Sequence, residues 1–282
     1  MTVTPIYPDA RGTLDAALKI LDQSLPGREL PVRLALSTLL GGGHLLIEDI
    51  PGTGKTRLAE TMAALFDLTF RRVQMTSDLL PTDITGSSVY DPKRGLFVFH
   101  EGPLFANILV ADEINRAPPR TQSAMLEAMA DRRVTENGIT RYLPEPFMVI
   151  ATANPVENVG VFPMPESELD RFMMRLSLGF PPIAIETAIL MGETFHEKIT
   201  PIGSARDLKR LQDAAKQVHC SRGIAEAIVR LLRQSRKEGK PLSIRAGLAM
   251  RDAARAWALI HNRDYITPDD LQVLEPHVFG HR

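Results

Sequence analysis

Residues 51–56, Pro-Gly-Thr-Gly-Lys-Thr, have the types and spacing of a phosphate-binding loop. They follow an apolar run at 45–47 and precede a helical pattern of apolar residues at 58–66. Glycines let backbone N–H groups turn inward around a phosphate, and the start of the following helix adds the positive end of its dipole. Lys55 supplies a cation and Thr56 a hydroxyl that suits Mg²⁺. We therefore expect a bound nucleoside triphosphate, held by the residues Pro51, Gly52, Thr53, Gly54, Lys55, Thr56 and Arg57.

The acidic pair Asp112 and Glu113 is a second candidate site, at the end of the apolar run 107–111. Beside a phosphate-binding loop, the first carboxylate would hold Mg²⁺ through its water shell, together with Thr56. The second would polarise the water that attacks the γ-phosphate. Adjacent acids favour ATPase over kinase chemistry. Taken alone, such a pair is also typical of a solvated strand end, but its position after the loop favours the catalytic interpretation.

The composition is that of an ordinary soluble protein with room for one large or two modest domains. The 282 residues are 44% hydrophobic and 24% charged, and 33 basic residues balance 34 acidic ones. This balance gives no overall attraction to nucleic acid or anionic lipid, and we expect no nucleic-acid partner. Cys220 is the only cysteine, which predicts no internal disulfide and favours a reducing cytosol. The start, Met1 to Arg11, lacks the apolar core of a secretory signal, and no run reaches the ~20 apolar residues of a membrane span. We therefore expect a cytoplasmic protein without direct membrane insertion.

Strand and helix patterns alternate through the first two thirds of the chain. Helices are expected after the phosphate-binding loop as far as Phe66 and from Arg120 to Asp131. Strands are expected near residues 44–48, 69–75, 107–111, 146–151 and 176–179. Such alternation predicts an α/β fold with a parallel sheet covered by helices on both faces. Its ligand should lie at the carboxyl ends of the strands, where Lys55, Asp112 and Asn154 all fall.

Only helical patterns follow the sequence Phe180-Pro181-Pro182. Amphipathic patterns recur there, and Thr267-Pro268-Asp269-Asp270 has the form of a helix start. We expect an α/β nucleotide-binding domain over residues 1–181 and a small all-helical domain over 182–282, hinged at the double proline.

With these elements together, the chain resembles the AAA+ ATPases and, more narrowly, the MoxR family. The stretches that carry the resemblance are 42–49, 78–86, 101–107, 111–119, 151–155 and 169–172. Asp49 stands where phosphate-binding loops usually open with glycine, and this departure is typical of the family. The resemblance implies an AAA+ P-loop fold with a C-terminal helical lid, ATP and Mg²⁺ as cofactors, and Asp49 among the residues of the nucleotide site.

The resemblance also implies roles for three polar residues. Asn154 matches the sensor-1 position, where an amide would hold the attacking water or the γ-phosphate. Arg171 matches the arginine finger, a guanidinium delivered to the nucleotide of a neighbouring subunit, which implies a ring and a homo-hexamer. Arg175 and Arg116 are alternative fingers. Arg245, in Ser243-Ile244-Arg245, resembles the sensor-2 arginine and should reach the γ-phosphate from the lid; the family more often has proline at Ile244.

Two hairpin patterns interrupt the alternation. One, at about 84–100, matches the helix-2 insert of the family, with Tyr90, Lys93 and Arg94 near its tip. The other, at about 132–146, carries the turn Asn137-Gly138 and matches the pre-sensor-1 hairpin. Both would face the ring pore or a client, or would merely complete the fold.

The resemblance favours an ATP-hydrolysing, ring-forming remodeller that acts on a protein client with a von Willebrand factor A-domain partner. A magnesium-chelatase-like motor subunit is a close alternative. A nucleic-acid motor is disfavoured by the near-neutral charge and the absence of a recognisable nucleic-acid module after residue 182. A nucleotide-binding scaffold without turnover is disfavoured by Glu113.

Overall fold

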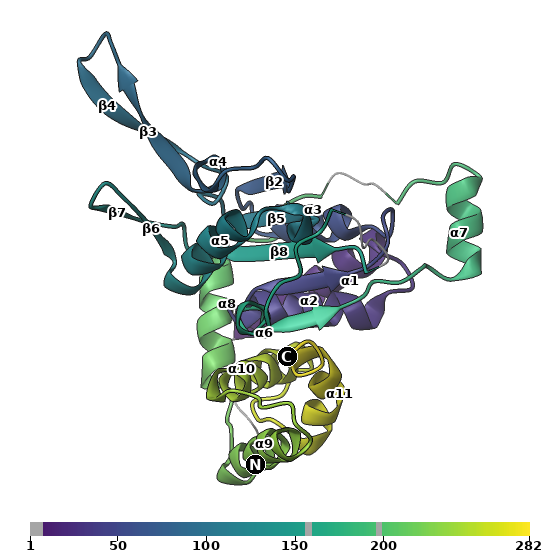
Figure 1. Ribbon diagram of the computed structural model, residues 1–282. Helices are drawn as coiled ribbons and strands as arrows, with labels where there is room; N and C mark the ends of the chain where they lie inside the picture. The colour runs from purple at the N-terminus through teal and green to yellow at the C-terminus, as the bar shows by residue number, and fades with distance from the viewer. Residues whose placement is uncertain (1–7, 156–159, 196–198) are drawn as a thin grey trace.

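A five-stranded parallel sheet forms the centre of the fold (Figure 1). The computed structural model describes residues 8–155, 160–195 and 199–282. The strands are β1 (Leu45–Glu48), β2 (Phe70–Gln74), β5 (Ile108–Asp112), β8 (Met148–Ala153) and β9 (Met174–Leu176), in the order β2-β5-β8-β1-β9. The predicted parallel sheet is confirmed, but the last strand was expected at 176–179 and ends at Leu176. Beyond it, the backbone N–H groups of Leu178 and Gly179 donate to Asp49 Oδ2, so the chain leaves the ladder early.

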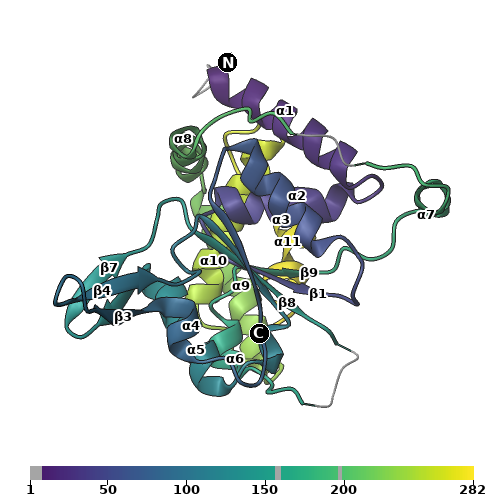
Figure 2. The ribbon, with the colours of Figure 1, turned by 90° about the horizontal axis from the view of Figure 1, so that it is seen from above.

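Helices cover both faces of this sheet, as the apolar strand patterns require. One face carries α1 (Pro8–Ser24), α2 (Glu29–Leu40) and α3 (Lys55–Leu65). The other carries α5 (Pro119–Asp131), the short helices α4 (Pro81–Thr85) and α6 (Glu166–Leu169), and the 3₁₀ turn η1 (Ile114–Arg116). Alternate residues of a strand point to opposite faces, so Ile47 packs among α1–α3 while Leu46 packs on the α5 side. Figure 2 shows the two helical layers with the sheet between them.

Two antiparallel hairpins project from the same side of the body (Figure 1). They are β3–β4 (Gly86–Asp91 with Leu96–Glu101) and β6–β7 (Arg133–Glu136 with Ile139–Tyr142). The carboxylate of Glu136 accepts from the backbone N–H and hydroxyl of Ser88 at 2.9 and 2.6 Å. The guanidinium of Arg141 lies 3.8 Å from the ring centre of Phe99. These contacts join the β6–β7 hairpin, including its tip, to the half of β3–β4 that is nearer the body.

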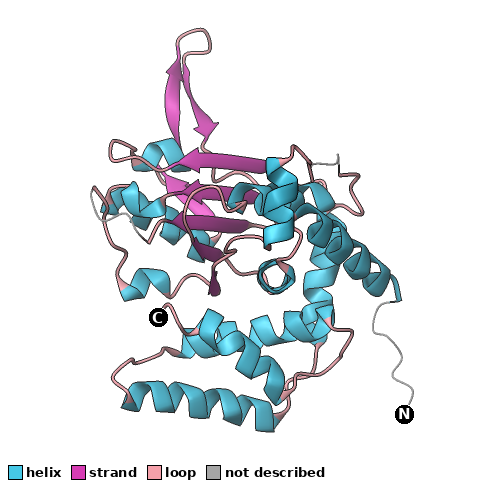
Figure 3. Cartoon of the chain, turned by 90° about the vertical axis from the view of Figure 1, so that its right-hand side faces the viewer, coloured by secondary structure: helices cyan, strands magenta, loops and turns pink. Residues whose placement is uncertain are grey.

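The last part of the chain is helical: α7 (Ile183–Leu190), α8 (Ala205–Gln217), α9 (Arg222–Lys237), α10 (Ile244–Ile260) and α11 (Pro268–Val278). Figure 3 shows C-terminal helices below the strands, with the β3–β4 hairpin rising on the opposite side. Apolar side chains of α8, α9, α10 and α11 continue the core formed by α1–α3, whereas α7 has no buried residue. In particular, Gln212 of α8 donates to the carbonyl of Leu39 in α2 at 2.8 Å. A boundary at residue 182 therefore stays a prediction, since α8 shares the core of the sheet layer. Within the described ranges, no helix has the length and apolar character needed to cross a membrane.

Candidate functional site

The loop between β1 and α3 has the backbone of an anion cradle. Gly52 and Gly54 have φ of +85° and +92°, a region that side chains with a Cβ rarely adopt. Gly54 is the N-cap of α3, and no side chain caps that helix. The first N–H groups of a helix have no intrahelical partner and carry the positive end of its dipole. The loop therefore presents donors to an anion at the place predicted from residues 51–57.

Two buried side chains outside the loop fix its position. Arg28, before α2, donates to the carbonyl of Thr53 at 2.6 Å and to that of Gly179 at 3.0 Å. Asp49 accepts from the N–H groups of Leu178 and Gly179 at 2.6 and 3.1 Å. Asp49 was predicted to belong to the nucleotide site, and that role stays a prediction, since its carboxylate accepts from the chain after β9. Its polar contacts are those of a support for the loop.

Lys55 lies at the point where the loop meets the acidic strand end. Its ammonium donates to the carbonyl of Asp49 at 2.7 Å. Burial lowers the pKa of Lys55, and the charges of Asp112, Asp49 and Glu113 oppose that shift. The amine and the acidic pair, 57 and 58 residues apart in sequence, are therefore brought within electrostatic range of one another.

A polar network holds Asp112 at the end of β5. Its Oδ1 accepts from the hydroxyl of Thr152 at 2.7 Å, and its Oδ2 accepts from Arg72 Nε at 2.8 Å. Thr152 and Arg72 belong to the two strands that flank β5. The sequence analysis did not predict these two residues as partners of Asp112. The only sequence signal for each is that a polar residue occurs within a strand-like run.

Glu113 follows in a left-handed conformation, with φ of +56°. Its N–H donates to the hydroxyl of Thr152 at 3.0 Å, which fixes the backbone. Its Oε2 accepts from Gln74 Nε2 at 2.8 Å and lies 2.9 Å from Arg116 Nε. The carboxylate is thus oriented by one residue from β2 and one from η1.

Asn154 directly follows β8, the strand between β5 and β1. The N–H of Asp49 donates to the carbonyl of Ala153 at 3.1 Å, so Asn154 leaves the sheet beside the start of the phosphate-binding loop. Carboxyl ends of parallel strands share one edge. The structure therefore brings Lys55, Glu113 and Asn154 to the same edge of the sheet, which we call the carboxyl edge.

Arg171 lies at the opposite, amino edge. β9 runs parallel to β1 with Met174 beside Leu45, so residues before Met174 lie where the strands begin. Lys55, in contrast, follows the end of β1. A strand rises about 3.3 Å per residue, so the two edges are separated by on the order of 15 Å. The structure does not bring Arg171 to the phosphate-binding loop of its own chain.

Arg245 is also at the amino edge, away from the phosphate-binding loop of its own chain, and its contact with a γ-phosphate stays a prediction. Ser243 caps α10 and donates its hydroxyl to Asp170 Oδ2 at 3.0 Å. This bond holds the start of α10 beside Arg171. Burial, and in smaller part the charge of Arg245, lower the pKa of Arg282, which contacts the same aspartate. The placement of the lid helices decides this outcome, and no local sequence signal encodes it.

The alternative fingers are engaged inside the chain. Arg175 pairs with Glu48 at 3.0 Å and donates to the carbonyl of Gly280 at 2.8 Å. Arg116 pairs with Glu113 at 2.9 Å, at the carboxyl edge. Arg171 differs, because its Nε and Nη1 have no hydrogen-bond partner among the described residues.

Comparison with known proteins agrees with this geometry. Residues 44–174 match the family described as "ATPase family associated with various cellular activities (AAA)", and residues 241–282 match an AAA lid domain. Chaperone MoxR1 of Mycobacterium tuberculosis is 39% identical over 96% of this chain and 75% of its own length. The chain belongs to the MoxR family of AAA+ ATPases.

Other relatives extend the likeness along the chain. The Bacillus subtilis protein YeaC, whose function is uncharacterised, is 40% identical over 97% of this chain and 88% of its own length. A proposed ATPase from Cytophaga hutchinsonii has a crystal structure that matches with a TM-score of 0.88 and 32% identity, over 97% of this chain and 88% of that one. The AAA+ domain with a C-terminal helical lid is thus confirmed.

Membership of the MoxR family implies a nucleotide and Mg²⁺, and the donors at the carboxyl edge fit both. Loop N–H groups and Lys55 suit phosphates, while Thr56 and Asp112 offer the oxygen ligands that Mg²⁺ prefers. In the described part of the chain, no group of three or more His, Cys, Asp or Glu residues is arranged to hold a metal. A Mg²⁺ ion here would therefore complete its shell with phosphate and water.

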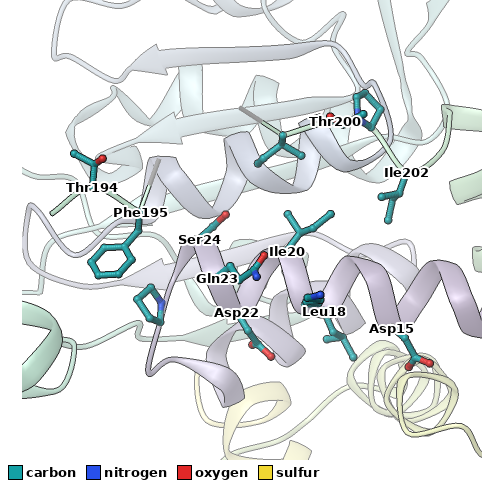
Figure 4. Close-up of a pocket in the computed structure, with 14 residues that line it drawn as sticks. Asp15, Leu18, Ile20, Asp22, Gln23, Ser24, Thr194, Phe195, Thr200 and Ile202 are labelled. Carbon is teal, nitrogen blue, oxygen red and sulfur yellow. The ribbon is translucent and has the colours of Figure 1, made fainter. Parts of the chain in front are cut away.

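Two hollows lie near the phosphate-binding loop of this MoxR-family protein. One, of about 690 Å³, is lined by Gly52, Thr53 and Gly54 and by apolar side chains that include Leu25, Ile185 and Ile189. Its apolar wall beside a phosphate cradle suits a nucleobase. The other, of about 1100 Å³, lies between α1 and residues 194–195 and 199–202, and no residue of the loop lines it (Figure 4). We assign the nucleotide to the first.

Proposed function

We propose that this protein hydrolyses ATP with Mg²⁺ in a ring of identical subunits, a hexamer, and uses the cycle to remodel a protein client. The observation that carries the proposal is the division between the two sheet edges. Lys55, Asp112, Glu113 and Asn154 share the carboxyl edge, whereas Arg171 lies across the sheet. An arginine finger so placed serves only the nucleotide of an adjacent subunit, which requires assembly.

The chemistry assigned to the carboxyl edge follows from its groups. Mg²⁺-bound ATP supplies the γ-phosphoryl group and the charge neutralisation that its transfer needs. Glu113 accepts a proton from the attacking water, and Asn154 orients that water or the γ-phosphate. Gln74 and Arg116 hold the Glu113 carboxylate at 2.8 and 2.9 Å, so its angle to the water depends on β2 and η1. Arg171, with Arg245 beside it, supplies positive charge to the neighbour's site.

The client role is supported by the hairpins and by the name of one relative, Chaperone MoxR1. Phe97, Tyr90 and Tyr142 are 70%, 53% and 76% exposed on β3–β4 and β7. Exposed aromatic side chains on a rigid extension suit contact with another protein. We also propose a cytoplasmic location and a von Willebrand factor A-domain partner, as the family resemblance implies.

Two substitutions separate nucleotide binding from hydrolysis. Lys55→Ala should lose ATP affinity, because the ammonium contacts the phosphates. Glu113→Gln should keep the affinity and lose turnover, because the amide does not accept a proton. Calorimetry measures binding and phosphate release measures turnover, with Lys209→Ala on the surface of α8 as the matched lysine control. Equal ATP affinity in the wild type and Lys55→Ala would overturn the assigned site.

A further inference from the structure

Asp170, immediately before Arg171, is held by two contacts with the C-terminal part of the chain. Asp170 Oδ1 pairs with Arg282 Nε at 2.8 Å, and its Oδ2 accepts from Ser243 at 3.0 Å. Only 4% of the Arg282 side chain and 17% of the Asp170 side chain are exposed. An ion pair so far removed from water is strongly sensitive to the loss of either partner. Asp170 therefore connects the start of α10 and the chain that follows α11 to the segment that carries Arg171.

Phe172, immediately after Arg171, is also held by hydrogen bonds. The carbonyl of Phe172 accepts from Arg282 Nη2 at 2.6 Å and from His281 Nε2 at 3.1 Å. Burial, aided by the charges of Arg282 and Arg175, lowers the pKa of His281 to about 3, so its ring is neutral at physiological pH and Nε2 carries the donated proton. The Phe172 side chain is fully buried.

The guanidinium of Arg171 itself has no such anchor. Its Nε and Nη1 are buried and lack hydrogen-bond partners in the described part of the chain. No hydrogen bond therefore fixes these two nitrogens, and the direction of the side chain depends on the packing around it and on its backbone, which Asp170 and Phe172 hold. Arg282 contacts both of these residues, so one side chain holds the backbone on either side of the finger.

We propose that Arg282 is a positioning residue for Arg171, with Ser243 as its helper, so that a shift of α10 and α11 in one subunit moves the arginine offered to the next. This rests on the proposed function, in which Arg171 acts on a neighbour's nucleotide. The position of the lid in each subunit would then determine where Arg171 lies in the adjacent active site. Misplacing a catalytic group by about 1 Å costs on the order of 10²-fold in rate.

Mixed rings locate the effect of Arg282. Lys55→Ala subunits donate a finger but hold no nucleotide, and Arg171→Ala subunits hold nucleotide but donate no finger. Arg282→Gln is introduced into one kind of subunit at a time, and ATP turnover of assembled mixed rings is measured against ATP concentration. We expect kcat to fall by about 10- to 100-fold when the change is in the finger donor. With the change in the nucleotide-holding subunit, kcat should stay within twofold, and KM should stay within twofold in both arrangements.

Further variants separate positioning from stability. Arg263→Gln in the finger donor breaks a comparable pair, Arg263 with Asp270 at 2.6 Å, far along the lid helices, and should leave kcat unchanged. Arg282→Lys keeps the charge beside Asp170, and kcat with this variant in the finger donor should be at least threefold higher than with Arg282→Gln. If Arg282→Gln subunits do not fold, Asp170→Asn replaces it in the same design. Equal losses from both kinds of subunit, or none, overturn the positioning role. Inactive parent rings without any change at Arg282 overturn the proposed function itself, and this inference with it.

Discussion

The carboxyl and amino edges of the sheet differ in where their polar groups find partners. At the carboxyl edge, Asp49, Asp112 and Glu113 are held by the same chain through Gly179, Thr152 and Gln74. At the amino edge, Arg171 is without partners for two of its nitrogens, and the hairpins expose Tyr90 and Phe97. One edge is organised to receive a small ligand, whereas the other combines buried arginine nitrogens that lack hydrogen-bond partners in the described chain with exposed aromatic rings on a hairpin. We therefore place the proposed nucleotide binding at the first edge and the proposed contacts between molecules at the second.

Arg171→Ala gives the largest expected effect. It tests directly whether the carboxyl edge binds the nucleotide while the amino edge supplies the arginine finger. In enzymes where its effect has been measured separately, an arginine finger raises kcat by roughly 10³- to 10⁵-fold. We expect kcat to fall by that order, while ATP affinity measured by calorimetry stays within about twofold. Arg120→Ala, on the exposed surface of α5, is the matched control. A tenfold loss of ATP affinity in Arg171→Ala would contradict the assignment of binding to the carboxyl edge alone.

Two buried histidines should make the amino edge sensitive to acid. His44, just before β1, accepts from the N–H of Val149 at its Nδ1 and lies 3.2 Å from the carbonyl of Met129 at its Nε2. Burial lowers the pKa of His44 to about 4 and that of His281 to about 3. An unfolded histidine titrates near 6.5, so between these values the unfolded chain binds more protons. Their stabilising contribution is therefore complete above about pH 6.5 and is lost as the pH falls toward 4 and 3.

The expected loss is about 2 kcal/mol per histidine between pH 7 and pH 5. Urea unfolding at pH 7, 6 and 5 measures it for the wild type, His44→Gln and His281→Gln. Each variant should have a flatter dependence on pH than the wild type, while His100→Gln, on the exposed hairpin, should not. A variant of His44 with an unchanged slope would show that this ring is not held neutral by the fold.

Arg28 offers a smaller test, at the carboxyl edge. Arg28→Gln removes the bonds to Thr53 and Gly179, which leaves a buried carbonyl unpaired and costs about 1–3 kcal/mol of unfolding free energy. Because Thr53 lies in the phosphate-binding loop, ATP affinity should fall by roughly tenfold as well. The control is Arg33→Gln in α2, which breaks the pair with Asp22 away from the loop. Loss of stability without loss of affinity would show that Arg28 supports the fold and not the loop.

The sequence predicted the carboxyl edge far better than the amino edge, for a physical reason. A phosphate-binding loop is encoded within six neighbouring residues, and Asp112–Glu113 ends a strand that its own apolar run defines. Their supports, Arg28, Gln74 and Thr152, come from distant elements and only the folded sheet brings them together. The place of Arg245 depends on how the lid docks, which residues near 245 do not encode. The strand predicted at 176–179 was misplaced because the backbone N–H of Leu178 donates to the carboxylate of Asp49, more than 120 residues away in sequence, and not to a neighbouring strand.

The smallest expected effect on the basal reaction comes from the tip of the β3–β4 hairpin, and it divides the amino edge into two functions. Tyr90, Lys93 and Arg94 lie far from the phosphate-binding loop, and Arg94 contributes only an exposed pair with Asp91. Substituting all three with alanine should leave basal ATP turnover within about a factor of three, because exposed hairpin tips seldom support a core. Client remodelling should fall sharply, since loop tips on rigid scaffolds commonly carry recognition. Partners captured with Glu113→Gln as an ATP-bound trap, with and without the tip substitutions, provide the measurement. Recovery of the same partners at the same yield would mean that the hairpin tip only completes the fold, and that Arg171 accounts for the function of this edge.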